Sequence, residues 1–144
     1  MKDNLYLKII TPDGIKYAEY VKIATIETVS DGFEGFMFKH LPMVGEITIG
    51  QMAITDLENN KKIAAVAGGF IYNDGNELKI LTPYFEFIDS INRNDIVNNI
   101  NTIKQKITEE KDENKLRTLN IALKNENNKL KAIDNVYIQN QQSF

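Results

Sequence analysis

The hydrophobic period of this chain changes near residue 88, and this change divides it into two parts of different structural class. Before it, apolar residues occur in short runs between turn signals, which is typical of β-strands. After it, four isoleucines follow the spacing of one helix face: Ile96, Ile100, Ile103 and Ile107. The sequence therefore predicts an α+β chain, with a sheet domain over residues 1–87 and a helical domain over residues 88–144.

Tight turns separate the predicted strands of the first domain. Thr11-Pro12-Asp13-Gly14 and Asn73-Asp74-Gly75-Asn76 have turn chemistry, because proline presets φ and glycine accepts positive φ. Gly68-Gly69 lies inside an apolar run, where glycine marks a bulge or a close backbone approach rather than a phosphate loop. Strands are expected over residues 5–10, 20–29, 46–50, 52–57, 63–72 and 77–81. This pattern predicts an antiparallel sandwich or barrel.

Two apolar stripes predict an antiparallel two-helix hairpin in the second domain. Asn92 can cap the first helix, and Asp95 suits its first turn because the helix dipole is positive there. A charged break over residues 110–114 precedes a second stripe, which Glu126 interrupts: Leu116, Leu119, Leu123, Leu130 and Ile133. The stripes are narrow, so we expect them to pack on each other, on the sheet domain or on another protein.

Composition excludes several classes of function. The chain has no cysteine and one histidine, so we expect no disulfide, no thiolate nucleophile and no metal site. A net charge of −3 gives no general attraction to nucleic acid or anionic lipid. No apolar run approaches the ~20 residues that span a bilayer, and the charged first residues lack a signal-peptide core. We therefore expect no cofactor, no nucleic-acid partner, no direct membrane insertion and a cytoplasmic location.

His40 is the one candidate for acid–base catalysis. Glu34 is close to it in sequence, but no recognisable motif supplies a nucleophile or places a partner for the imidazole. A structural or interface histidine is therefore the favoured interpretation. We predict no catalytic residue, and a stand-alone hydrolase that uses His40 and Glu34 is the minor alternative.

Several stretches, taken in their order, resemble the epsilon subunit of the rotary ATP synthase, which is the delta subunit in mitochondrial nomenclature. They are LKIITPDGIKY, then DGFEGFMFKHLP with Gly32, Gly35, His40 and Pro42 in a glycine and histidine-proline loop, then Gly50, AVAGGF and LKIL. The resemblance covers nearly the whole chain. It implies a sandwich of about ten strands followed by two helices. It also implies a non-catalytic rotor subunit of the central stalk, which joins the gamma subunit to the membrane ring of c subunits.

The resemblance also implies where these partners bind. Contacts with gamma are expected at Gly35, Phe36, Met37, Phe38, His40 and Pro42. Contacts with the ring are expected at Asp31, Gly32, Phe33 and Glu34, on the cytoplasmic face of the cell membrane. The ring loop departs from the family, since Phe33 stands where glutamate is usual and Phe38 where proline is usual. A diverged rotary ATPase without a standard proton ring therefore stays an open alternative.

In the family the hairpin can extend, meet the catalytic alpha and beta subunits and block ATP hydrolysis. A basic cluster near the predicted tip could make that contact, or be a solvated helix face: Lys104, Lys106, Lys111, Lys115 and Arg117. Some bacterial members bind ATP through Ile-Asp and two arginines on the first helix. Here the arginine positions hold Asn92 and Asn99 if Ile88-Asp89 is the pair, or Asp95 and Thr102 if Ile91-Asn92 is. We predict no such ATP site, and a nucleotide-sensing module is the remaining alternative.

Overall fold

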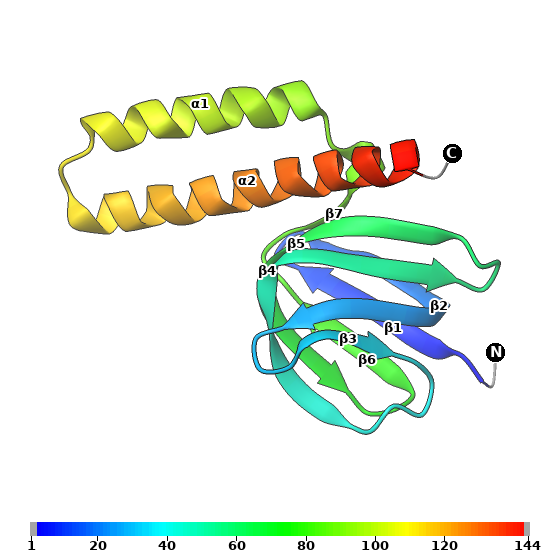
Figure 1. The fold of residues 1–144 in the computed structure, drawn as a ribbon. Coiled ribbons are helices and arrows are strands. Elements are labelled where there is room, and N and C mark those ends of the chain that lie inside the picture. The colour runs from blue at the N-terminus through cyan, green and yellow to red at the C-terminus, as the bar shows by residue number, and fades with distance from the viewer. Residues whose placement is uncertain (1–2, 143–144) are drawn as a thin grey trace. The chain divides into compact units, whose positions relative to one another are not determined.

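A computed structural model describes residues 3–142 of the chain, and the side chains of residues 3–134. The chain forms two compact units, Met1–Phe87 and Ile88–Phe144. The first unit contains the strands and the second the helices, as Figure 1 shows.

The first unit is one sheet that closes on itself. In the described part of the chain it has seven strands: β1 (Leu5–Thr11), β2 (Gly14–Thr28), β3 (Gly32–Phe36), β4 (Met43–Asp56), β5 (Lys61–Asn73), β6 (Glu77–Leu81) and β7 (Phe85–Phe87). Strand β1 pairs with both β2 and β6, so that β1, β6, β5, β4 and β2 form a closed circuit. Strand β3 extends the sheet beside β2, and β7 pairs with β5. This barrel-like sandwich confirms the predicted class.

The predicted number of about ten strands is too high, because the long strands β2, β4 and β5 each pair with more than one neighbouring strand. Strand β2 pairs with β1 through Gly14–Val21 and with β4 through Val21–Thr28. Two strands were expected within residues 46–57, but β4 is continuous there because it pairs with β5 through Gly50 and Gln51. The sheet is also not wholly antiparallel, since β1 and β6 run parallel.

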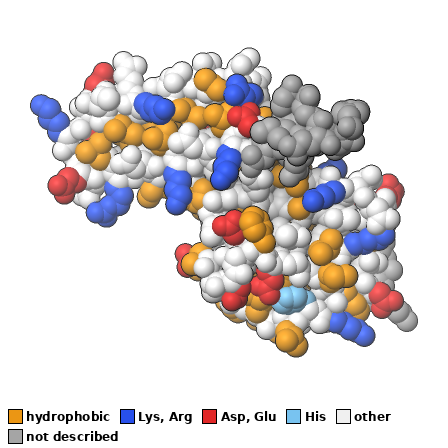
Figure 2. Space-filling model, viewed as in Figure 1, with side chains coloured by type: hydrophobic (Ala, Val, Ile, Leu, Met, Phe, Trp, Pro, Cys, Tyr) orange, Lys and Arg blue, Asp and Glu red, His pale blue; other side chains and the backbone are white. Residues whose placement is uncertain are grey.

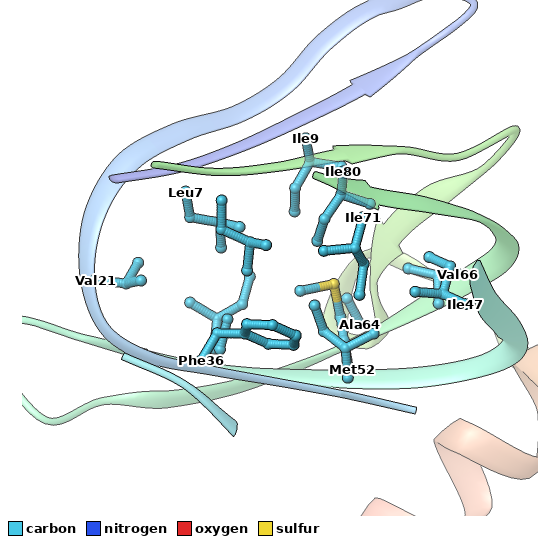
Figure 3. Close-up of a cluster of buried hydrophobic side chains, with 14 of the residues drawn as sticks. Leu7, Ile9, Val21, Phe36, Ile47, Met52, Ala64, Val66, Ile71 and Ile80 are labelled. Atoms are coloured by element: carbon cyan, nitrogen blue, oxygen red, sulfur yellow. The ribbon is translucent and has the colours of Figure 1, made fainter. Parts of the chain in front are cut away.

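The core lies inside this closed sheet (Figure 3), and on β1 it is built by strict alternation. On β1, Leu5, Leu7 and Ile9 are fully buried while the residues between them are partly exposed. Each such side chain stabilises the fold by about 1.5–3 kcal/mol relative to an exposed one. Phe36, at the end of β3, is also fully buried.

The two glycines inside β5 allow a close backbone approach, as their position predicts. Gly69 has φ of +118°, and a Cβ on it would overlap the carbonyl oxygen of Leu81 in β6. Only glycine accepts both this φ and this contact.

The second unit is the predicted helical hairpin, with η1 (Ile88–Ser90), α1 (Arg93–Glu109) and α2 (Glu113–Gln142). The Asn92 side chain accepts hydrogen bonds from the backbone N–H groups of Asn94 and Asp95, at 2.9 and 3.3 Å, so the predicted cap is confirmed. The connection is residues 110–112, where the Asp112 carboxylate accepts from the N–H of Asn114 at 2.9 Å. Among the described residues, no helix combines the length and apolarity that crossing a bilayer requires.

Candidate docking surface

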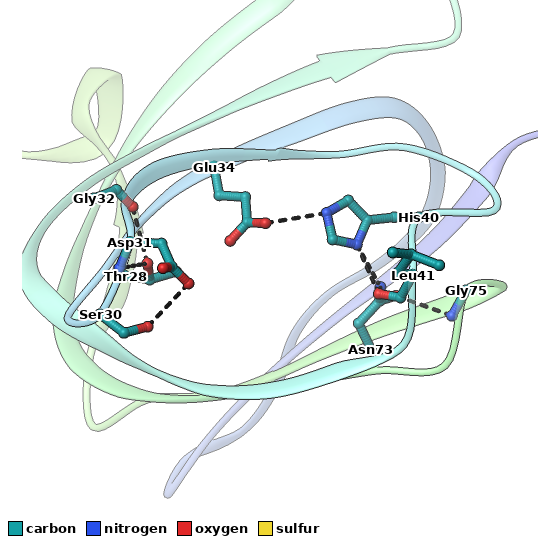
Figure 4. Close-up of polar contacts among 9 residues, drawn as sticks. All are labelled: Thr28, Ser30, Asp31, Gly32, Glu34, His40, Leu41, Asn73 and Gly75. Carbon is teal, nitrogen blue, oxygen red and sulfur yellow. Dashed lines mark hydrogen bonds and ion pairs between the residues drawn. The ribbon is translucent and has the colours of Figure 1, made fainter.

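The turn between β2 and β3 and the first residues of β3 carry the residues for which ring contacts were predicted. Thr28 forms this turn, because its hydroxyl donates to the carbonyl of Gly32 at 3.0 Å and accepts from the N–H of Asp31 at 3.1 Å (Figure 4). Asp31, Gly32 and Phe33 are exposed, whereas Glu34 is half-buried. The turn and the start of β3 therefore present one carboxylate and one large aromatic ring to solvent.

His40 is fixed by its neighbours. Its Nε2 lies 3.2 Å from the Glu34 carboxylate, and its Nδ1 lies 2.8 Å from the carbonyl of Leu41 and 3.3 Å from Nδ2 of Asn73 (Figure 4). The imidazole ring also packs against Phe36, with 4.6 Å between the centroids of the two rings. Because both nitrogens face polar partners from the described residues, this imidazole connects segments of the fold.

Asn73 joins the loop after β3 to the turn between β5 and β6. This buried side chain donates to the carbonyl of Leu41 at 3.3 Å and accepts from the N–H of Gly75 at 3.2 Å. The N–H of Lys39 donates to the carbonyl of Gly75 at 2.8 Å. Sequence reasoning assigned Asn73 only to the hairpin turn, because its contacts with His40 and Leu41 are long-range and leave no local signal.

Phe36 is a correction to the predicted gamma contacts. It is fully buried in the core, because alternation along β3 turns it inward opposite Ala24. The other predicted contact residues stay accessible: Gly35, Met37 and Pro42 are exposed, and Phe38 and His40 are half-buried.

The outer side of β4, β5 and β6 carries an apolar surface that the sequence did not reveal. Val44 pairs in register with Tyr72, and Phe70 pairs with Leu81. The exposed fractions of these side chains are 70%, 58%, 58% and 46% respectively. We call these four residues the β4–β5–β6 patch.

A shallow groove of about 440 Å³ continues the patch between Phe70, Leu81, Pro12 and Pro83. Figure 2 shows hydrophobic side chains on the viewed surface of the sandwich, among charged ones. Exposed apolar surface of this kind is typical of sites where another macromolecule docks. Phe70 and Tyr72 are the sequence signal for this surface, but only the strand register shows that both side chains face outward.

The basic cluster does not form one cationic face. All five residues are exposed: Lys104, Lys106, Lys111, Lys115 and Arg117. Lys106 and Lys115 line a groove of about 660 Å³ at the hairpin tip together with Glu109 and Glu110. Arg117 lines a different groove on α2. The tip therefore has mixed charge.

Arg93, the arginine nearest the family's ATP-binding positions, is engaged within the hairpin. Its Nε lies 3.1 Å from the Asp134 carboxylate, so it connects the start of α1 to α2. Among residues 3–134, no three histidine, aspartate or glutamate side chains are placed to hold a metal ion.

Comparison with known proteins places these features in a family. Residues 4–88 match the family described as ATP synthase, Delta/Epsilon chain, beta-sandwich domain. The ATP synthase epsilon chain of Alkaliphilus metalliredigens is 37% identical over 91 residues, which are 63% of this chain and 66% of that protein. The ATP synthase epsilon chain of Mycoplasma mobile is 26% identical over 136 residues, which are 93% of this chain and 96% of that protein.

A solved structure has the same fold. It is a chain in the cryo-EM structure of the Euglena gracilis mitochondrial ATP synthase, comprising OSCP, F1 and c-ring, with a TM-score of 0.70 and 21% identity. The match covers 87% of this chain and 78% of that one. Because the family match covers more than half of the sequence, this chain belongs to the ATP synthase delta/epsilon chain family.

Proposed function

We propose that this chain is a rotor subunit of an ATP synthase, a non-catalytic part of the central stalk that joins the gamma subunit to the ring of c subunits. The observation that carries the proposal is a sandwich of the delta/epsilon family with exposed apolar side chains on its outer side. Such a subunit works by shape and contact. It would lie at the cytoplasmic face of the membrane, held there by its partners.

Gamma docks, in this proposal, on the β4–β5–β6 patch and on the accessible residues of the loop after β3. Burial of the patch in a protein interface would stabilise the complex through the hydrophobic effect. His40 supports this surface from within, because its contact with Glu34 holds the loop against β3.

The ring docks on the turn between β2 and β3 and on the start of β3, through exposed Asp31, Gly32 and Phe33. Because glutamate is usual in the family at the position of Phe33, the contact with the ring would be apolar here instead of being made by a carboxylate. Glu34 contributes by orienting His40 rather than by direct contact.

The hairpin regulates ATP hydrolysis by contact with the catalytic subunits. Its packing is imperfect, which suits an element that changes its arrangement. Glu126 is paired with Lys129 at 2.7 Å, but its Oε2 and the Oδ1 of Asn125 are buried without a hydrogen-bond partner. Each such atom costs about 1–3 kcal/mol. Deletion of residues 88–144 is expected to raise the ATPase rate of the assembled complex, and an unchanged rate would refute the regulatory role.

Single cysteines test the docking surfaces, because the chain has no cysteine of its own. Tyr72→Cys, Phe33→Cys and Glu58→Cys, each labelled with a photo-crosslinker, would be assembled into the complex. We expect Tyr72→Cys to crosslink to gamma, Phe33→Cys to subunit c, and the control in the exposed β4–β5 turn to neither. A crosslink to gamma without one to subunit c would favour a diverged rotary ATPase. Absence of both would contradict the rotor proposal.

A further inference from the structure

A second hollow of about 400 Å³ lies on the sandwich, and aromatic and acidic side chains line it together. It is lined by Asn4, Tyr6, Tyr20, Phe38, Asp74, Asn76 and Glu77. These residues come from the start of β1 with the residue before it, from β2, from the loop after β3, and from the β5–β6 turn with the first residue of β6. Of these, the proposed function uses only Phe38.

The aromatic rings are positioned by the sheet. Tyr6 and Tyr20 are cross-strand partners in β1 and β2, and their centroids lie 5.1 Å apart in an edge-to-face arrangement. Phe38 is half-buried, and the Nζ of Lys39 lies 5.7 Å from its ring centroid. Aromatic faces attract cations through their quadrupole. Because Lys39 of this chain already lies over the Phe38 ring, a cation from a ligand would rely on Tyr6 and Tyr20.

The two acids add formal negative charge at the same place. The Oδ1 of Asp74 accepts from the N–H groups of Asn76 and Glu77, both at 2.8 Å, and these bonds hold the pKa of Asp74 below its ordinary value. Because both bonds end on Oδ1, Oδ2 can accept from a ligand. The charge of Lys79 also acts on Asp74 and offsets part of its negative charge. The half-buried Glu77 provides a second carboxylate in the hollow.

We propose that this hollow binds the guanidinium group of an arginine side chain from a partner protein. A guanidinium stacks on aromatic faces and donates along its edge to carboxylates, which matches the two kinds of side chain present. A quaternary ammonium would stack but has no N–H for the acids. Residues 1–86 carry 8 lysines against 12 acidic residues, so the sandwich as a whole also attracts a basic segment.

A protein partner, rather than free arginine, fits the surroundings of the hollow. Phe38 belongs to the loop after β3, and Met37 and Leu41 of the same loop are exposed. A peptide chain that places arginine in the hollow can cover these apolar side chains. The site stands independently of the rotor proposal, because it can be measured on the isolated chain.

An NMR titration of the full ¹⁵N-labelled chain tests the proposal with N-acetyl-arginine amide as the probe. We expect saturable shifts at the amides of Tyr20, Asn76 and Glu77, with a dissociation constant in the millimolar range. The uncharged citrulline analogue has nearly the same shape, and we expect no saturable shift from it. The lysine analogue and tetramethylammonium should bind at least about threefold more weakly, because neither has a planar donor fork.

Two variants with matched controls locate the site. Glu77→Gln and Tyr20→Leu should each weaken arginine binding by about threefold or more. Glu58→Gln and Tyr72→Leu change an acid and a tyrosine outside the hollow, and they should leave the affinity unchanged. The proposal is overturned if citrulline or tetramethylammonium binds as well as arginine, if no saturable shift occurs, or if the variants bind like their controls.

Discussion

The Nε2 atom of His40 lies 3.2 Å from the carboxylate of Glu34, so the loop after β3 is attached to the strand that precedes it. Glu34 comes from the segment predicted to face the ring, and His40 from the segment predicted to face gamma. The pair therefore couples the two proposed docking surfaces within one unit. It gives the chain's single histidine a structural role.

A double-mutant cycle measures this coupling. We expect Glu34→Ala and His40→Ala each to lower the free energy of unfolding, with a coupling of about 0.5–1 kcal/mol because the pair is partly exposed. Urea unfolding of the single and double variants provides the measurement. Strictly additive effects would show that the contact contributes nothing to stability.

Phe36 and Phe33 lie three residues apart on the same strand but differ in burial. Phe36→Ala should lower the free energy of unfolding by about 3–5 kcal/mol, because it opens a cavity in the core. Phe33→Ala removes an exposed ring, so the change should stay within about 0.5 kcal/mol. Equal effects of the two substitutions in denaturant unfolding would contradict the assigned register of β3.

Gly69 and Gly14 share a positive φ, at +118° and +116°, but only Gly69 is crowded. Gly69→Ala combines backbone strain with overlap against Leu81, so we expect loss of several kcal/mol or failure to fold. Gly14→Ala has no atom within 4 Å of the new Cβ and should cost only about 1–2 kcal/mol. Thermal unfolding separates the two cases, and equal transition temperatures would argue against the close approach of β5 and β6.

Asp74 gives the sandwich a stability that depends on pH. Backbone hydrogen bonds lower its folded pKa below the ordinary value of 3.8, so its contribution is fully present well above pH 3.8. That contribution is lost as pH falls through the folded pKa. Asp74→Asn keeps an acceptor oxygen but cannot ionise, so its unfolding free energy should fall less steeply with acid. Identical slopes for the two proteins between about pH 5 and 2 would refute this.

The sequence predicted the caps and turns that depend only on residues close to one another in the chain. Asn92 caps α1 because a short acceptor side chain precedes the helix, and Asp-Gly forms the turn between β5 and β6 for a similar reason. The change of period near residue 88 likewise coincides with the boundary between the two compact units.

The remaining features depend on register, which no local pattern determines. The parallel pairing of β1 with β6 and the pairing of β3 with β2 join segments that are apart in sequence. Residues 70–72 are apolar in succession, so the sequence alone does not say that Ile71 faces the core while Phe70 and Tyr72 face out. For the same reason the hollow between Tyr6, Tyr20 and Glu77 could not be found before the fold was known.

The central claim is that this chain is a stalk subunit of an ATP synthase. The most direct measurement is affinity purification of the tagged full chain from the membranes of its own cells, with identification of every recovered protein by mass spectrometry. The account predicts recovery of a gamma subunit, the catalytic alpha and beta subunits and subunit c, and predicts loss of gamma when Phe70 and Tyr72 are both replaced by serine. Recovery of the chain alone would contradict this claim. Retention of gamma by the double variant would contradict the assignment of the β4–β5–β6 patch as the gamma docking surface.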